Sequence, residues 1–215
     1  MSINDVSPAG VALKLADAVT EAHHEFRSQS DHIRYGLEWV LSGFYQVMAV
    51  VLLAFPFQLH KEALVCLITG ALLRMASGGV HFASYWWCFA VGTVQILFSS
   101  FLAAAFEQQG LHIPLVPTFV ILAAGLILTA VFAPRLYKTK LLFSHTRLLV
   151  FKGVSVALYT LLSILMLSII TDPSLQFVIG MALFYQVFSL TPFGDKTIQF
   201  FNSLSTNPAE RRRVS

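Results

Sequence analysis

The chain has 215 residues, of which 56% are hydrophobic and 12% are charged, whereas about 25% of the residues of an ordinary soluble domain are charged. A soluble domain with the usual solvated surface is therefore excluded. The net charge of +3 does not indicate nucleic-acid binding, because the cations gather in one loop and at the C-terminus without interleaved aromatic residues. The two cysteines, Cys66 and Cys88, are too few for a disulfide framework or a thiolate metal site, so we expect neither a metal nor another cofactor.

The N-terminal region predicts one amphipathic helix from Ser7 to Leu37. Ser7 followed by Pro8 is typical of a helix start, because the hydroxyl caps free amides and the proline ring fits the first helical position. Apolar residues then recur at spacings of mostly three and four. We expect this helix to lie on the membrane surface or beneath the helix bundle. Residues 1–38 are polar and acidic, so a cleavable signal peptide is not expected.

Six apolar segments follow, and most have the roughly 20 residues that a helix needs to cross the hydrocarbon core of a bilayer. The second is the exception, because it is short and runs into Arg74 and Gly78-Gly79, which predicts a short, tilted or re-entrant segment. The predicted fold class is all-α: a polytopic membrane protein with about six transmembrane helices and one interfacial helix. The predicted segments are Trp39 to Leu59, Ala63 to about Ala76, Tyr85 to Phe106, Leu115 to Ala133, Leu148 to Ile170 and Leu175 to about Leu190.

Lysine and arginine in the loops predict the orientation, since cytoplasmic loops are enriched in them. The loop from Pro134 to Arg147 carries four such cations and no acid, and the C-terminal tail carries Lys196 and Arg211 to Arg213. Both should face the cytoplasm, which six crossings satisfy with both termini inside. The loop from Arg74 to about Ser84 then also lies on the cytoplasmic side. Lys61, expected outside, is the one exception.

No repeat, linker or low-complexity run divides the chain, so we expect one membrane domain over residues 1–215. Within it, residues 1–38 form the surface helix, residues 39–192 the transmembrane bundle and residues 193–215 a cytoplasmic tail. The end of this tail, from Ser203, is polar and is expected to be disordered.

The stretch from Arg74 to Cys88 combines a cation, two adjacent glycines, an imidazole and a thiol within fifteen residues. The unperturbed pKa of a thiol is about 8.5, but a neighbouring imidazole can take the proton and hold the thiolate as an ion pair. His81 and Cys88 are therefore candidates for the general base and the nucleophile of a cysteine protease. Arg74, Gly78 and Gly79 are candidates for supporting roles.

The spacing of His81 and Cys88 constrains their geometry. In an unbroken helix, side chains seven residues apart share a face but lie about 10 Å apart along the axis, which is too far for direct proton transfer. Gly78-Gly79 permits backbone conformations that other residues resist, so we expect the helix to break there and to bring His81 back toward Cys88. No acid is near this stretch in the sequence, so we favour a dyad without a carboxylate and name Glu38 only as a candidate third member.

Structural roles for these residues stay open. A lone cysteine is often inert packing, a histidine near a helix end is often structural, and Arg74 could reach the lipid headgroups. His23-His24-Glu25 resembles part of a zinc helix, but Ser28 stands where the second histidine ligand is needed, so we reject a zinc site. Glutamines within the apolar segments, interpreted as packing contacts between helices, are Gln46, Gln95 and Gln186.

The run Arg74…Gly78-Gly79-x-His81…Cys88 strongly resembles the accessory gene regulator protein B family, membrane cysteine endopeptidases that process a quorum-sensing propeptide in Gram-positive bacteria. Three further landmarks are similar to that family: Ile33-Arg-Tyr-Gly-Leu-Glu38, Ala133-Pro134 and Leu190-Thr-Pro192. The basic loop departs from the family, because Pro134-Arg-Leu-Tyr-Lys-Thr-Lys140 lacks a polar, acid-containing start. Length and segment count agree, so the resemblance covers nearly the whole chain.

The resemblance implies a hydrolase of the thiol protease type. Cys88 would attack a peptide carbonyl near the C-terminal side of a propeptide, with His81 as base and then acid, to form an acyl-enzyme thioester. A cysteine of the peptide would then capture the acyl group as a cyclic thiolactone. The implied partners are this propeptide and the lipid bilayer, without nucleic acid. A homodimer, and a role of the surface helix in receiving the propeptide, stay open.

Two rival functions stay open beside this one. The first is a small membrane peptide exporter or transporter without proteolytic activity, and the second is a membrane scaffold without catalysis. A transporter usually shows internal repeats or paired broken helices, whereas this sequence indicates one broken region. A scaffold would need no chemistry in the stretch from Arg74 to Cys88.

Overall fold

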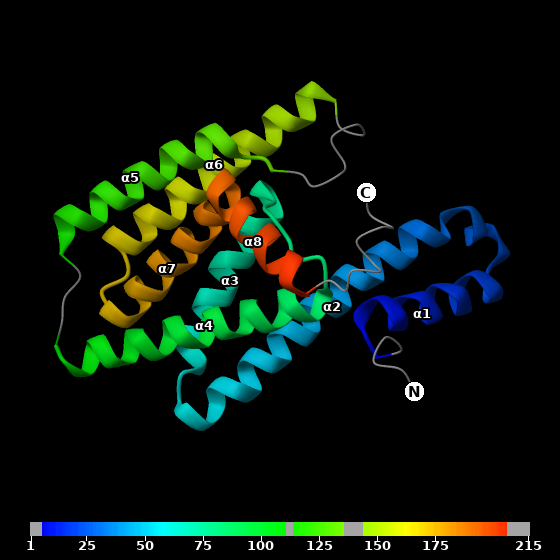
Figure 1. Cartoon of the computed structure of the whole chain (residues 1–215), viewed down its shortest axis with the longest axis horizontal. Coiled ribbons are helices and arrows are strands. Elements are labelled where there is room, and N and C mark those ends of the chain that lie inside the picture. The colour runs from blue at the N-terminus through cyan, green and yellow to red at the C-terminus, as the bar shows by residue number, and fades with distance from the viewer. Residues whose placement is uncertain (1–5, 111–113, 136–143, 206–215) are drawn as a thin grey trace. The chain divides into compact units, whose positions relative to one another are not determined.

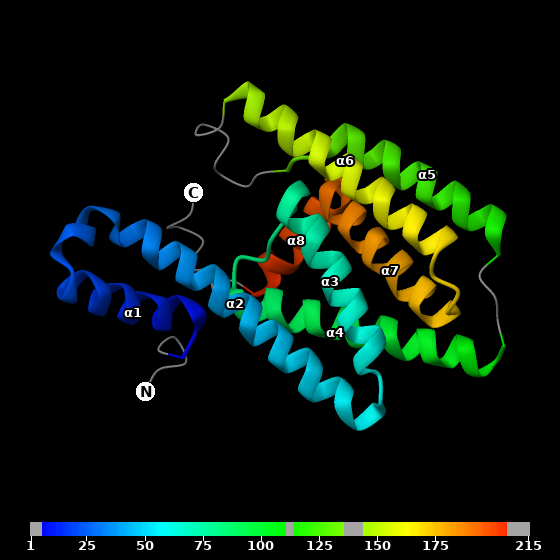
Figure 2. The same cartoon turned by 180° about the vertical axis from the view of Figure 1, so that it is seen from behind.

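The computed structural model describes residues 6–110, 114–135 and 144–205. These residues are almost entirely helical, which confirms the predicted all-α fold class (Figure 1 and Figure 2). The chain divides into two compact units, residues 1–52 and 53–215.

The first unit contains α1 (Pro8–Ala22), the 3-10 helix η2 (His24–Gln29) and most of α2 (Ser30–Ala54). Ser7 caps α1 as predicted, because its side-chain oxygen accepts a hydrogen bond from the Gly10 amide at 3.1 Å. The single helix expected from Ser7 to Leu37 is wrong in its extent: α1 ends at Ala22 and the chain turns before α2. The turn lies in residues 23–29, where the two histidines, Phe26 and Ser28 favour helices only weakly.

The remaining helices belong to the second unit, and local residue chemistry explains several of their ends. α5 ends before Pro134, because a proline disfavours helical backbone in the residue that precedes it. α7 begins at Pro173, where the Asp172 carboxylate accepts hydrogen bonds from the next free amides. The elements are η3 (Phe55–Phe57), α3 (His60–Ser77), α4 (Tyr85–Gln108), α5 (Leu115–Phe132), α6 (His145–Ser168), α7 (Pro173–Leu190) and α8 (Pro192–Ser205).

Helix α7 is the centre of the second unit. It packs against α3, α4, α5, α6 and α8, and both views show α5, α6 and α7 side by side (Figure 1 and Figure 2). Two apolar clusters meet on this helix. The larger one contains Leu73, Leu122, Tyr159, Met166, Ile179, Leu183 and Val187, and the smaller one Cys66, Ala103, Val178 and Ala182.

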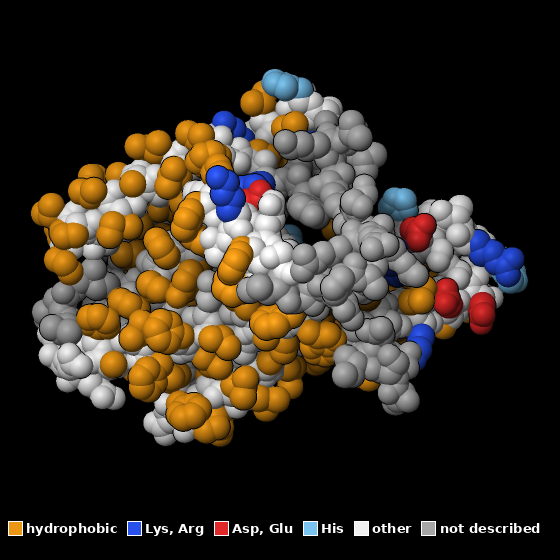
Figure 3. Space-filling model, in the orientation of Figure 1, with side chains coloured by type: hydrophobic (Ala, Val, Ile, Leu, Met, Phe, Trp, Pro, Cys, Tyr) orange, Lys and Arg blue, Asp and Glu red, His pale blue; other side chains and the backbone are white. Residues whose placement is uncertain are grey.

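Five helical stretches among the described residues are long and apolar enough to cross a membrane: residues 24–57, α4, α5, α6 and α7. In the second unit, hydrophobic side chains cover most of the visible face over α4 to α7 (Figure 3). This is the build of a multi-pass membrane protein. The remaining predicted segment is α3, whose 18 residues include Lys61, Glu62 and Arg74. It is the segment that the sequence singles out as short.

The C-terminal region is more ordered than the sequence predicts. The first residues of the expected tail form α8 directly after Thr191, whose hydroxyl accepts a hydrogen bond from the Gly194 amide at 3.2 Å. The helix continues through Ser203 to Ser205, so the disorder expected from Ser203 is wrong for these residues. The rest of the predicted tail lies outside the described residues, as do Lys138, Lys140 and Arg211 to Arg213.

Candidate active site

The candidate site begins where α3 breaks. The helix ends at Ser77, and Gly78 and Gly79 have φ angles of +68° and +141°, a backbone region that favours glycine. Space also requires glycine here, because a Cβ on Gly78 would collide with the backbone carbonyl of Arg135 and one on Gly79 would lie 2.6 Å from the Ser189 hydroxyl. The break predicted at Gly78-Gly79 is therefore present, and close backbone packing enforces it.

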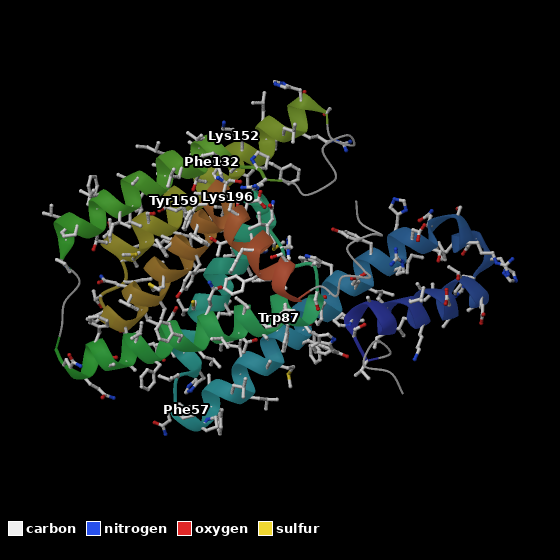
Figure 4. The ribbon with its side chains drawn as sticks, viewed as in Figure 1. Phe57, Trp87, Phe132, Lys152, Tyr159 and Lys196 are labelled. Atoms are coloured by element: carbon white, nitrogen blue, oxygen red, sulfur yellow. The ribbon has the colours of Figure 1, made fainter. Side chains whose placement is uncertain are left out.

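This break brings His81 and Cys88 together. His81 lies in the turn after Gly79, while Cys88 lies in the first turn of α4, where its amide bonds to the Ser84 carbonyl at 3.1 Å. The distance between His81 Nδ1 and Cys88 Sγ is 4.0 Å, far shorter than an unbroken helix would allow. Trp87, half-exposed beside Cys88, lies in the same helical turn (Figure 4), as suits an indole at a membrane interface.

Arg74 turns back onto the same site. Its Nη2 donates a hydrogen bond to the Val80 carbonyl at 2.7 Å and lies 3.1 Å from His81 Nδ1. The same Nη2 lies 3.5 Å from His81 Nε2, so the guanidinium is close to both ring nitrogens, and the donor and acceptor roles of these nitrogens depend on the tautomer. Nδ1 is the ring nitrogen that faces Cys88, and in the tautomer with its hydrogen on Nε2 it could accept the thiol proton.

The electrostatics of the site favour a neutral imidazole. Burial, together with the positive charge of Arg74, lowers the pKa of His81 to about 4, so the ring carries no charge at neutral pH. A negative charge on Cys88 and the cation of Arg74 attract each other. A neutral imidazole in this place could accept a proton from a neighbouring group.

The two remaining sequence candidates have different outcomes. Glu38 lies in α2, in the first unit, and its part in the site stays a prediction. Cys66 is 3% exposed in the core of the second unit, where it packs as a small hydrophobic residue. Among the residues that the structure describes, no group of three His, Cys, Asp or Glu side chains is arranged to hold a metal ion.

Sequence reasoning missed the residues that hold the turn in place. Gln186 and Ser189 of α7, and Arg135 after α5, bond to residues 77–80. Asn202 of α8 accepts a hydrogen bond from the Ala83 amide at 3.0 Å. The one sequence signal was a glutamine at position 186 within an apolar segment, which indicated a polar partner without identifying it.

Comparisons with known proteins give a consistent assignment. The family model described as Accessory gene regulator B matches residues 12–190. AgrB-like protein 2 of Clostridium perfringens (strain 13 / Type A) is 26% identical over 122 residues, which cover 56% of this chain and 57% of that protein. An AgrB-like protein of Clostridium perfringens (strain SM101 / Type A) is 24% identical over 205 residues, 88% of this chain and 95% of that protein. No solved structure matches the chain.

The family match includes the break in α3, the loop after it and the first turns of α4, and it continues to the last residue of α7. The chain belongs to the accessory gene regulator B family.

Proposed function

We propose that the chain is a membrane cysteine endopeptidase that cleaves a quorum-sensing propeptide near its C-terminal side. Its family connects the chain with accessory gene regulator peptide processing. One observation carries the finer assignment: His81 Nδ1 lies 4.0 Å from Cys88 Sγ. This distance is long for a proton transfer, but such contacts are often loose without substrate and shorten when it binds.

The first half of the reaction forms a thioester. As the Cys88 sulfur attacks the peptide carbonyl carbon, the thiol proton moves to His81 Nδ1 and a tetrahedral oxyanion forms. The imidazolium then gives this proton to the nitrogen of the leaving amine while the C–N bond breaks. The N-terminal part of the propeptide stays bound to Cys88 as an acyl-enzyme.

The second half transfers the acyl group to the peptide's own thiol. A cysteine of the bound peptide attacks the thioester carbonyl, its proton passes through His81 to the Cys88 sulfur, and a cyclic thiolactone leaves. One thioester replaces another, so the energy of that bond is kept, whereas water would discharge it. Cys88 is half-buried at the start of an apolar helix. This position suits the exchange because it limits access of bulk water.

Arg74 would support both halves electrostatically. Burial and the cation of Arg74 together lower the pKa of His81, so the imidazole stays in the neutral form that a general base needs. The same cation attracts the sulfur as it becomes negative. When His81 takes the proton, repulsion between the two cations would release Arg74 from Nδ1 and leave it free to pair with the sulfur or the oxyanion.

We further propose that the site faces the cytoplasm. α3 and α5 end, and α6 begins, on the side of the second unit where the loop with His81 lies. Arg135, Arg147 and Lys196 belong to this side, which fits the enrichment of cations in cytoplasmic loops. Lys61, at the opposite end of α3, forms an ion pair with Asp172. Its charge is therefore neutralised locally and argues only weakly against the proposed orientation.

Co-expression with the short peptide encoded beside the gene tests the proposed function. Mass spectrometry of the peptide measures cleavage and ring formation. Cys88→Ala and His81→Ala should abolish the cleaved product, and Cys88→Ser should lower it at least about a hundredfold, since a hydroxyl is a far weaker nucleophile. Cys66→Ala, which removes the other thiol, is the matched control and should process like the parent. Undiminished processing by Cys88→Ala would exclude the proposed function as a cysteine endopeptidase.

A further inference from the structure

A buried glutamine of α7 holds the turn that carries His81. Gln186 is 6% exposed, and its Nε2 donates to the Ser77 hydroxyl and to the Gly78 carbonyl, each at 2.7 Å. These two bonds use both amide hydrogens. An amide is costly to bury in an apolar helix unless it is hydrogen-bonded, and both of its donor bonds end on the turn.

The same helix makes a further contact with the turn through its backbone. The Val80 amide donates to the Ser189 carbonyl at 3.2 Å, three residues after Gln186 in α7. On the other side of the turn, the fully buried Ser77 hydroxyl donates to the Leu73 carbonyl at 2.7 Å. The turn is thus held between α3 and α7 immediately before His81.

Arg135 ties the turn to two more elements. Its amide donates to the Ser77 carbonyl at 2.8 Å, and its carbonyl accepts from the Gly79 amide at 3.1 Å. Its guanidinium bonds to the Leu190 and Thr191 carbonyls, both at 2.9 Å, and to the Asp195 carboxylate at 2.6 Å. The main chain of Arg135 therefore holds the turn, while its side chain anchors it to the end of α7 and to α8.

These contacts matter because His81 has no helix of its own to position it. The side chain of Cys88 is fixed by α4, whereas the place of His81 depends on the backbone path through Gly78, Gly79 and Val80. The contact between Nδ1 and Sγ is already 4.0 Å, so a further shift of about 1 Å would separate base and nucleophile. Misplacement of that size can cost about a hundredfold in rate.

We propose that Gln186 and Arg135 are positioning residues of the reaction, which hold the turn at Ser77–Val80 so that the His81 imidazole lies against the Cys88 sulfur. This inference rests on the proposed function, because it assumes that the two groups act as base and nucleophile. Neither Gln186 nor Arg135 needs to touch the substrate. Their loss should change the chemistry at Cys88 only through His81.

The test measures the rate at which iodoacetamide alkylates Cys88 in the full chain in lipid nanodiscs. A Cys66→Ala background leaves Cys88 as the sole thiol. His81→Ala should slow alkylation at pH 7 by about tenfold, because no imidazole then takes the thiol proton as the sulfur attacks the reagent. Gln186→Leu removes both hydrogen bonds at similar size and should slow it about fivefold. The double variant Gln186→Leu/His81→Ala should react at the rate of His81→Ala alone, since the effects of two residues that act through one another are not additive.

One further variant keeps the test decisive if Gln186→Leu does not fold. Arg135→Lys retains the charge but not the forked bonds and should slow alkylation about threefold, again only when His81 is present. Matched controls are Arg147→Lys, at the exposed start of α6, and Gln95→Leu, a glutamine of α4 that donates no hydrogen bond to residues 77–83 of the described chain. Both controls should react like the parent.

The possible outcomes separate the two proposals. If His81→Ala reacts like the parent, the proposed base is wrong and the inference falls with it. If His81→Ala is slow but Gln186→Leu and Arg135→Lys react like the parent, only the positioning role is overturned. Equal slowing by Gln186→Leu with and without His81 would also overturn it, because the effect would not pass through the imidazole.

Discussion

The guanidinium of Arg74 lies 3.1 Å from Nδ1 of His81, the same nitrogen that faces the Cys88 sulfur. A cation in this place opposes protonation of the imidazole and at the same time attracts a negative sulfur. Both effects fit the proposed roles of His81 as a neutral base and of Cys88 as the nucleophile. Arg74 therefore does more than reach toward lipid headgroups.

The pH dependence of cleavage follows from the lowered pKa of His81. The base is active when neutral, and its pKa of about 4 lies below the ordinary value of about 6.5. Activity on the acid side should therefore be retained from pH 7 to about pH 5 and be lost only as the pH falls through about 4. The measurement is kcat/KM for propeptide cleavage in proteoliposomes, which reports the groups of the free enzyme.

Arg74→Gln should move the acid limb of this pH profile upward, because it removes the charge that opposes protonation of His81, but the limb should stay below 6.5 because burial, the larger cause of the lowered pKa, remains. The matched control is Arg147→Gln, which removes a cation from the start of α6 and should leave the limb in place. An acid limb near 6.5 in the parent would contradict the lowered pKa of His81. A limb that does not move in Arg74→Gln would show that Arg74 does not act on the imidazole.

Gly78→Ala should lower cleavage at least tenfold and destabilise the protein by about 1–3 kcal/mol. The backbone there has a positive φ, which costs a residue with a side chain energy, and the new Cβ would also collide with the Arg135 carbonyl. Gly110→Ala is a matched control, since Gly110 also has a positive φ of +64° but open space around it. Thermal melting and cleavage assays should show a small stability loss and full cleavage for Gly110→Ala. Equal effects of Gly78→Ala and Gly110→Ala would refute a specific role of the turn.

The ion pair between Lys61 and Asp172 should contribute stability without affecting the site. Burial alone would raise the pKa of Asp172, but hydrogen bonds from Lys61 and Ser174 outweigh it and lower this pKa to about 2. A carboxylate with a lowered pKa contributes above its unfolded value, near 4, and loses its contribution as the pH falls toward 2. Lys61→Met should therefore lower the melting temperature equally at pH 6 and pH 8.

The expected size is about 1–4 °C, because a largely exposed pair contributes at most about 1 kcal/mol. Cys88 alkylation should stay at the parent rate. Lys152→Met in α6 is the control, as Lys152 pairs with no acid among the described residues. A melting temperature identical to that of the parent would show that the pair is not stabilising, and slower alkylation would show an unexpected link to the site.

Local features were predictable from the sequence where one residue determines the backbone. Ser7 with Pro8 marked the start of α1, Pro134 marked the end of α5, and Gly78-Gly79 marked the break in α3. Hydropathy indicated the apolar helices and singled out α3 as the weakest of them. These signals depend on neighbours within a few residues, which a sequence shows directly.

The rest depends on contacts between distant residues. Gln186 bonds to Ser77, 109 positions away, and nothing near position 186 indicates that partner. The direction of Arg74 depends on the Val80 carbonyl, which reaches it only after the chain has turned. α8 was missed because its charged and polar residues concealed phenylalanines at spacings of seven and one, Phe193, Phe200 and Phe201.

The most direct test of the account is the intact mass of the protein after brief incubation with the propeptide. We predict an adduct equal to the N-terminal part of the propeptide on Cys88, which neutral hydroxylamine removes as it does other thioesters. The adduct should be absent from Cys88→Ala and present in Cys66→Ala. An adduct that persists in Cys88→Ala, or cleavage by the parent with no thioester under any trapping condition, would contradict the central claim.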